Sequence, residues 1–230
     1  MEAIFAKNLA HIEQRWPALA ELLSHQDISS VQAELLEGRE STLLLEGIQL
    51  TSRHDRWGEA KMQAEVIAAE EPEIHLYGTG LGELPTLLLQ RPALKRLVVH
   101  LLNELHFALL LHLLEQEWLV HPKVDLQLAA DSKELSLPFL TTPAELHLAS
   151  DRNAKLRDRL VAEIELPYVN SRFDIAEPTK LARIEENRAR VAADPDVREL
   201  FGTRKGTKAI VIATGPSLVK HYAKLKALSS

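Results

Sequence analysis

Three closely spaced glycines follow a short apolar run, at a point where backbone amides could meet a phosphate or a ribose. Gly78, Gly80 and Gly82 come directly after EIHLY, in the pattern G-x-G-x-G. Glycines at a strand-to-helix turn let the backbone approach a ligand closely, and the first amides of the helix favour an anion. Glu104 stands at the expected end of the next strand, where dinucleotide folds place a carboxylate on ribose hydroxyls. The four residues form a candidate nucleotide site.

Two other interpretations of this turn compete with a dinucleotide site. The first is purely structural, because glycines also occur where a strand turns tightly into a helix without any ligand. The second is a methyltransferase, since G-x-G-x-G is the spacing of many adenosylmethionine-dependent methyltransferases. Those enzymes usually place an acidic residue two positions before the first glycine, where this chain has Leu76. That departure argues against a methyltransferase.

A second strand-to-helix turn lies near the carboxyl end, in the sequence AIVIATGPSL. Its apolar residues are mostly β-branched, which predicts a strand covered on both faces. Gly215 can adopt a backbone conformation closed to other residues, and Pro216 suits the first position of a helix. The unpaired amides of that helix start, together with the Ser217 hydroxyl, predict a small anion site for a phosphate or pyrophosphate.

Other reactive side chains do not match a catalytic spacing. His106, His112 and Glu115 lie on one apolar segment, but their spacing matches neither HExxH nor a facial set of ligands. On a helix, His106 and His112 would lie about 240° apart, which favours core or interface histidines over a metal site. The sequence has no GxSxG elbow and no P-loop, and no cysteine for a disulfide or a thiolate metal site. We therefore predict no metal site.

The amino-acid composition is typical of a folded protein, with a modest negative net charge. The 230 residues are 46% hydrophobic and 26% charged, with a formal net charge of -6, which argues against nucleic acid or an anionic membrane as a partner. The most apolar run, LVVHLLNELHFALLLHLL, contains three histidines and a glutamate, whose burial in a bilayer would be costly. It predicts a buried strand followed by a buried helix. With no signal peptide at the amino terminus, we expect a cytoplasmic protein.

The amino-terminal part is predicted to form helices and a β-hairpin. Apolar residues recur there every three or four positions, and Pro17 should break or kink the helix. Residues 30–52 then alternate short β-like runs with the turns EGRE and EG, which predicts a hairpin or a small meander. Residues 53–69 are expected to form a helix with Trp57 and Met62 turned inward.

Three apolar runs bracketed by helical segments predict a parallel sheet with crossover helices. The runs are EIHLYG, LKRLVVHLL and VDLQLAA, and their alternation with helices is typical of a Rossmann-like α/β fold. The run AELHLAS at 144–150 is expected to add a further strand.

Polar helices follow the predicted sheet. We expect an amphipathic helix at 151–164, an extended connector at LPYVNSRF, a solvated helix at 178–193 that starts with proline, and a short helix at DPDVRELFG. The predicted parts of this α/β chain are a helical and β-hairpin region at 1–71, a Rossmann-like domain at 72–150, a helical linker at 151–207, and the first strand of a second, incomplete α/β domain at 208–230.

The strand followed by GPSL resembles the family of motility-associated factors, the bacterial flagellin glycosyltransferases. Their central domain shares a region with archaeal 6-hydroxymethylpterin pyrophosphokinases and often opens with a strand followed by GxGPSL. The upstream IHLYGTGLGE is similar to the glycine turn of that family's amino-terminal Rossmann-like domain. Since the order and separation of the two turns also match, the resemblance covers most of the chain. Ala213 replaces the first glycine of GxGPSL and limits how closely a ligand can approach there.

The resemblance implies transfer of a nonulosonic acid, such as pseudaminic or legionaminic acid, from a CMP-linked donor to Ser or Thr of flagellin. Flagellin and a nucleotide sugar are the implied partners. No other cofactor is implied, and the catalytic base stays unassigned. The donor-binding loop would include Thr214, Gly215, Pro216, Ser217 and Leu218.

One strand and two helical turns cannot bury a sheet. We therefore expect the second unit to be completed by residues outside this chain, which would make the chain a truncated amino-terminal fragment with little activity alone; otherwise its strand joins the first sheet. Two further functions stay open. One is a module that recruits flagellin, with an edge strand at 30–52 and a helical brace at 151–193. The other is a small-molecule enzyme at the Gly78 turn, resembling a pterin pyrophosphokinase or a methyltransferase.

Overall fold

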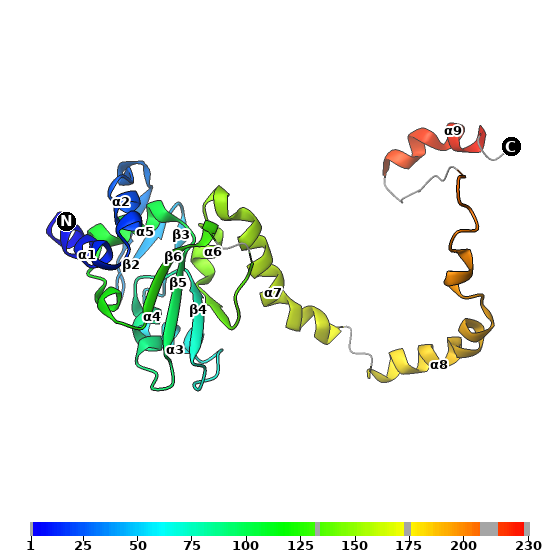
Figure 1. Ribbon diagram of the computed structural model, residues 1–230, viewed down its shortest axis with the longest axis horizontal. Helices are drawn as coiled ribbons and strands as arrows, with labels where there is room; N and C mark the ends of the chain where they lie inside the picture. Colours follow the sequence, from blue (N-terminus) through cyan, green and yellow to red (C-terminus); the bar gives the residue numbers. More distant parts are fainter. Residues whose placement is uncertain (1, 132–133, 173–175, 208–215, 228–230) are drawn as a thin grey trace. The chain divides into compact units, whose positions relative to one another are not determined.

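The computed structural model describes residues 2–131, 134–172, 176–207 and 216–227. The chain divides into two compact units, Met1–Ser171 and Arg172–Ser230 (Figure 1). All the strands of the described chain belong to the first unit, and the described residues of the second unit form helices and turns.

Two helices open the first unit, as the three-to-four-residue periodicity predicts. They are α1 (Glu2–Arg15) and α2 (Pro17–Ser24), so that Trp16 alone separates them. Pro17 occupies the first turn of α2, where a missing backbone N–H removes no helical hydrogen bond. Ile12 and Leu23 anchor the two helices in the main core.

A small antiparallel sheet follows and confirms the expected meander. Its strand order is β1-β2-β3, so β2 is central and β1 and β3 are edges. Glu46 and Gly47 connect β2 to β3 with positive φ angles of 48° and 79°, the two-residue geometry of a type I′ turn. The strands are β1 (Ala33–Leu36), β2 (Thr42–Leu45) and β3 (Ile48–Gln49).

Helix α3 (Arg56–Ala64) forms where a helix is predicted, but it buries different residues. Ala60 and Ala64 are its buried residues, whereas Trp57 is 45% exposed and Met62 is 72% exposed. The prediction that the two large side chains turn inward is therefore wrong. Small alanine side chains form the inner face because α3 packs directly against the neighbouring helix α4.

Asp55 caps the amino end of α3. Its Oδ1 accepts a hydrogen bond from Gly58 N at 2.7 Å, which satisfies an amide that has no partner within the helix. We expect Asp55→Ala to lower the free energy of unfolding of the chain by about 1 kcal/mol, measured by urea denaturation. Asp55→Ser retains an acceptor and should stay close to the wild type. Equal losses for the two variants would contradict the capping role.

The centre of the first unit is a four-stranded parallel sheet in the order β6-β5-β4-β7. Three of its strands, β4, β5 and β6, are the apolar runs that the sequence predicts, and α4 and α5 form the crossovers between them. The predicted Rossmann-like α/β fold is confirmed. The elements are β4 (Glu73–Tyr77), α4 (Glu83–Leu89), β5 (Arg96–Leu101), α5 (Glu104–Leu113) and β6 (Val124–Leu128).

The fourth strand is not the one that the sequence indicates. AELHLAS, expected as a strand at 144–150, lies largely in helix α6 (Pro143–His147). The strand beside β4 is β7 (Phe139–Thr141), which pairs with it in parallel. It is only three residues long and is preceded by Pro138, so it is too short to present an alternating pattern.

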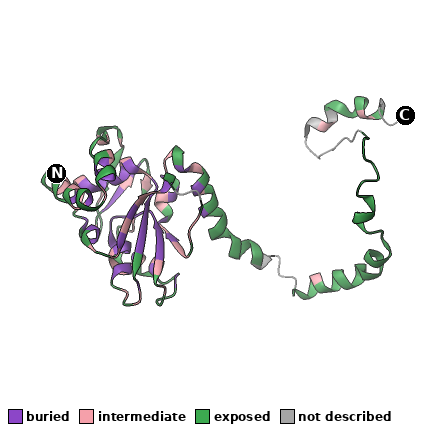
Figure 2. Cartoon of the chain, in the orientation of Figure 1, coloured by how far each residue is buried: buried purple, intermediate pink, exposed green. Residues whose placement is uncertain are grey.

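The two faces of the parallel sheet are covered differently. One face carries aliphatic side chains from all four strands and packs against helices α1 to α5 in one continuous core (Figure 2). The other face carries Tyr77, which packs with Leu156 and Leu160 of helix α7. The short helices of this unit are η1 (Ile28–Ser30), η2 (Glu117–Val120), η3 (Ala129–Asp131) and η4 (Asp151–Asn153).

Helix α7 (Ala154–Arg172) is longer than predicted, because it continues through Pro167. The prediction of an extended connector at LPYVNSRF is therefore wrong. An interior proline removes one backbone hydrogen bond, but the helical turns on either side of it can still form their own hydrogen bonds. The apolar series Leu156, Leu160 and Ile164 keeps the four-residue spacing of a helix, and Ile164 is 48% exposed.

The described residues of the second unit contain α8 (Pro178–Ala193), which begins and ends where the sequence predicts. It has no buried residue, in agreement with its charged sequence. The short helix expected at DPDVRELFG is the 3-10 helix η5 (Val197–Leu200), and η6 (Pro216–His221) and α9 (Tyr222–Ala227) follow. The predicted terminal strand that begins at Lys208 lies outside the described residues. Across the described ranges, no helix combines the length and apolarity needed to cross a membrane.

Candidate functional site

The three glycines of the first motif form the turn between β4 and α4. Gly78, Gly80 and Gly82 have φ angles of 89°, 57° and 112°, a region that favours glycine over residues with a Cβ atom. Gly82 is the N-cap of α4. The turn thus has the strand-to-helix position that the sequence predicts, with its backbone amides at the carboxyl edge of the parallel sheet.

A carboxyl group of the chain itself accepts hydrogen bonds from two of these amides. Oε2 of Glu145, on α6, accepts hydrogen bonds from Thr79 N at 2.6 Å and Gly80 N at 2.5 Å. It also accepts one from the Thr142 hydroxyl at 2.6 Å. Burial raises the pKa of Glu145, and the three donors act in the opposite direction. The net pKa of Glu145 is raised, and one oxygen of this internal carboxyl group holds the position that a ligand's phosphate or carboxylate would take.

Little space remains beside the turn. A Cβ atom on Gly78 would collide with Thr142 Oγ1 and approach Glu145 Oε2 to 2.7 Å. The adjoining cavity has a volume of about 10 Å³, and Thr51 from the segment after β3 contributes to its wall. Such a volume holds at most one water molecule. A nucleotide at this turn would have to displace Glu145 and the segments around it.

Glu104 takes no part in these hydrogen bonds. Glu104 is the first residue of α5 and is 7% exposed. Its Oε1 is buried and has no hydrogen-bond partner among the described residues. The neighbouring Asn103 caps α5 by accepting a hydrogen bond from His106 N at 3.2 Å. The predicted contact of Glu104 with ribose hydroxyls stays a prediction, while Thr79 N and Gly80 N of the turn are bonded to Glu145.

Glu145 and Thr142 are the two partners of the glycine turn that the sequence prediction missed. They belong to the segment TPAE, which has the T-x-x-E spacing of a capping box with proline at the first helical position. That pattern could have identified the start of α6. Thr142 N donates to Tyr77 O in the sheet, so Glu145 does not accept from it, as a capping box would, and bonds the glycine turn instead.

The second predicted site lies mostly outside the described residues. Thr214 and Gly215 are not described, so the predicted donor-binding loop stays a prediction. Pro216, Ser217 and Leu218 begin η6, which agrees with a helix that starts at Pro216. The predicted absence of a metal site also stays a prediction, although no group of three metal-ligating side chains occurs among the described residues.

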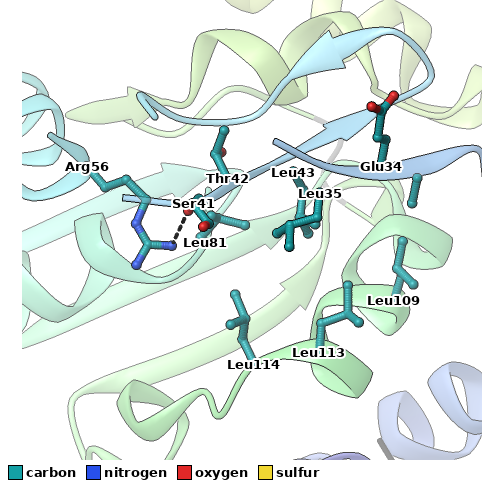
Figure 3. A pocket seen from close by; sticks show the side chains of 11 residues that line it. Glu34, Leu35, Ser41, Thr42, Leu43, Arg56, Leu81, Leu109, Leu113 and Leu114 are labelled. Carbon is teal, nitrogen blue, oxygen red and sulfur yellow. Dashed lines mark hydrogen bonds between the residues drawn. The ribbon is translucent and has the colours of Figure 1, made fainter. Parts of the chain in front are cut away.

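An open groove lies between the small sheet and α5 (Figure 3). Its volume is about 540 Å³, and its lining is mostly aliphatic. Strands β1 and β2 form one wall, and the last turns of α5 form the opposite wall. Leu81 reaches it from the glycine turn, so the groove adjoins the turn without opening it. The leucines that line the groove are Leu35, Leu43, Leu81, Leu109, Leu113 and Leu114.

Arg56 lies at one end of the groove and is held by other residues of the chain. Its Nη1 donates to Ser41 O at 3.1 Å, and its Nε forms an ion pair with Glu83 Oε1 at 3.1 Å. Burial raises the pKa of Glu83, and Arg56 opposes that shift. A second hollow of about 270 Å³ shares Arg56 and Leu81 with the groove and continues to Trp57. The two hollows are therefore neighbours.

A pair of buried histidines lies on the less covered face of the parallel sheet. His75 Nδ1 is 3.0 Å from His100 Nε2, and His75 Nε2 is 3.2 Å from Glu73 Oε1. The ring of His100 stacks on Tyr77 at 4.3 Å. Burial is the main cause that lowers the pKa of both histidines, that of His100 to about 4, which favours neutral imidazole rings near pH 7.

No protein-family model matches the chain, and no curated protein matches it. Solved structures with a similar fold include spermidine synthase from Thermotoga maritima, with 12% identity, a TM-score of 0.40, and coverage of 50% of this chain and 44% of that chain. Another is spermidine synthase in complex with the transition-state analogue AdoDATO, with 13% identity, a TM-score of 0.40, and coverage of 51% and 46%. The matched part spans less than half the length of each.

Proposed function

We propose that the first unit is an accessory protein-binding domain with a closed Rossmann turn, and that it recruits flagellin for a glycosyltransferase. The observation that carries this proposal is the bonding of Thr79 N and Gly80 N to the chain's own Glu145. Because those amides already bond to a carboxyl oxygen of the chain, a nucleotide or adenosylmethionine gains little by binding there. The open aliphatic groove beside the turn is a surface suited to a protein segment.

The connection to flagellin has a different basis. It rests on the resemblance of AIVIATGPSL and of IHLYGTGLGE to the motility-associated factors, which implies transfer from a CMP-linked nonulosonic acid. In this proposal the terminal turn, Thr214 to Leu218, belongs to the donor site, and the first unit contributes acceptor binding. If the Gly78 turn instead bound a small-molecule substrate, Glu145 would first have to give up its three hydrogen bonds.

Thermal unfolding of the 230-residue chain with millimolar CMP, CTP, ATP or adenosylmethionine tests the closed turn. A ligand at 100 times its dissociation constant would stabilise the chain by about 2.7 kcal/mol. We expect no stabilisation from a ligand at the glycine turn. Ser217→Ala is the matched variant. If a ligand stabilises the wild type but not Ser217→Ala, that ligand binds at the terminal turn. Stabilisation that persists in Ser217→Ala would contradict the proposal.

Direct binding tests the recruiting role. The 230-residue chain is passed over immobilised monomeric flagellin, and the equilibrium response is measured against an unrelated acidic protein of similar size. We expect saturable binding to flagellin alone. The recruiting role would be refuted by equal responses to the two surfaces.

A further inference from the structure

Strand β1 presents an unpaired outer edge. Glu46 N donates to Gln32 O at 2.9 Å across the β1–β2 pair, and Leu50 N donates to Leu43 O at 2.9 Å on the other side of β2. Since bonded and non-bonded pairs alternate along antiparallel strands, the backbone groups of Ala33 and Leu35 point away from β2. No strand of the described chain lies on that side.

The inner face of β1 is also uncovered. Leu35 lies opposite Leu43 in the register, so the two side chains share one face of the small sheet. Leu43 is 8% exposed, whereas Leu35 is 60% exposed. Leu35 therefore overhangs the groove above Leu113 on α5 (Figure 3). An aliphatic side chain inserted beneath β1 would bury apolar surface that now faces water.

Acidic residues outnumber basic ones along β1 and the turn that follows it, where Arg39 is the exposed cation. Glu34 is exposed on β1 itself, Glu37 is exposed directly after it, and Glu117 is exposed in the wall of the adjoining hollow. Arg56 is engaged by Glu83, so it does not neutralise these residues. A second copy of the chain would bring its own Glu34 and Glu37 against the same acids. Charge complementarity therefore favours a partner segment that carries lysine or arginine.

We propose that the β1 edge and the leucine groove bind an extended segment of a partner protein, which adds as a fourth strand to the small sheet. The segment places alternate aliphatic side chains beneath β1 and basic side chains beside Glu34. Main-chain hydrogen bonds to Ala33 and Leu35 supply its register, and the groove selects its side chains. This inference deepens the proposed function by naming the surface that receives the acceptor protein.

A designed peptide of eight residues, Lys-Val-Thr-Val-Lys-Val-Thr-Val with blocked ends, is a suitable probe. Fluorescence anisotropy with the 230-residue chain should give saturable binding in the micromolar range, and the same peptide with N-methylated alternate amides should bind about tenfold more weakly. A peptide with glutamate in place of lysine should also bind more weakly. Absence of binding at millimolar peptide, or equal binding of all three peptides, would overturn the inference.

Leu35→Pro is the matching variant of the chain. Proline removes the outward N–H of Leu35, which has no partner in the sheet, and proline is tolerated on an edge strand. We expect at least about tenfold weaker peptide binding. Val66→Lys changes a residue that is 77% exposed and does not line the groove, so its affinity should match the wild type. Thermal unfolding of both variants reports whether each remains folded, and Leu35→Lys replaces the proline variant if it does not.

The same variants separate this inference from the proposed function. If flagellin binds the wild type and Leu35→Pro equally, the groove assignment is wrong and the recruiting role stands. If flagellin does not bind but the peptide does, the recruiting role fails and the groove assignment stands. Sedimentation of the chain over a range of concentrations adds a third outcome, since a dimer that Leu35→Pro abolishes would assign the edge to a second copy and overturn the partner segment.

Discussion

Replacing Gly78 with alanine is expected to lower the free energy of unfolding of the 230-residue chain by about 4 kcal/mol. Two costs combine in this estimate. At a φ of 89° an alanine is strained, and its Cβ atom would collide with Thr142 Oγ1 and crowd Glu145 Oε2. The collision would separate Glu145 from the amides of Thr79 and Gly80, which would leave buried donors without partners. Urea denaturation monitored by tryptophan fluorescence measures the loss.

Gly47→Ala is the matched control for this prediction. Gly47 has a similar φ of 79°, but a Cβ atom there would meet nothing within 4 Å. Its expected cost is therefore the backbone strain alone, about 1 kcal/mol. If Gly78→Ala and Gly47→Ala proved equally costly, the glycine turn would not be closed by Glu145 in solution, and the proposed function would lose its main support.

The second large effect is a loss of stability in acid that depends on His100. Burial lowers the pKa of His100 to about 4 in the folded chain, whereas a histidine in an unfolded chain titrates near pH 6.5. Between these two values the unfolded chain binds a proton that the folded chain does not bind. The contribution of His100 to the free energy of unfolding is therefore fully present above pH 6.5. It falls by about 3 kcal/mol as the pH drops to 4.

His100→Phe isolates that contribution. Phenylalanine retains a ring to stack on Tyr77 but cannot titrate, so the difference in unfolding free energy between wild type and variant should change by about 3 kcal/mol from pH 7 to pH 4. The subtraction cancels other titrating groups, such as Glu145 and Glu83, whose raised pKa values act in the opposite sense. His54→Gln, at an exposed position, should follow the wild-type profile. Parallel profiles for His100→Phe and the wild type would refute the prediction.

The sequence predicted the elements that have strong periodicity. The apolar runs of β4, β5 and β6 and the helices α1, α2 and α8 are long enough to show their spacing, and all of them form as predicted. The wrong predictions concern very short elements and single large side chains. Strand β7 has three residues, and Met62 is apolar but exposed, because alanines form the packed face of α3.

The candidate site was predictable only in part. The position of Gly78, Gly80 and Gly82 after a strand follows from local sequence, because each glycine permits the positive φ that the turn requires. The partner of the turn does not follow from local sequence. Glu145 lies 66 positions after Thr79, and its contact depends on how β7 and α6 are placed beside β4. Tertiary packing therefore decides whether the amides face solvent, a ligand or the protein itself.

A hydrogen-bond acceptor that is covalently part of the chain cannot be lost by dissociation of a ligand. Domains that complete a phosphate-binding loop with a metabolite gain stability only while that metabolite is abundant, because the gain follows mass action. With Glu145 in the loop, the domain reaches its full stability as soon as it folds after synthesis, whatever the nucleotide concentrations in the cell. Changes in nucleotide concentration would then leave the free energy of unfolding of the domain unchanged.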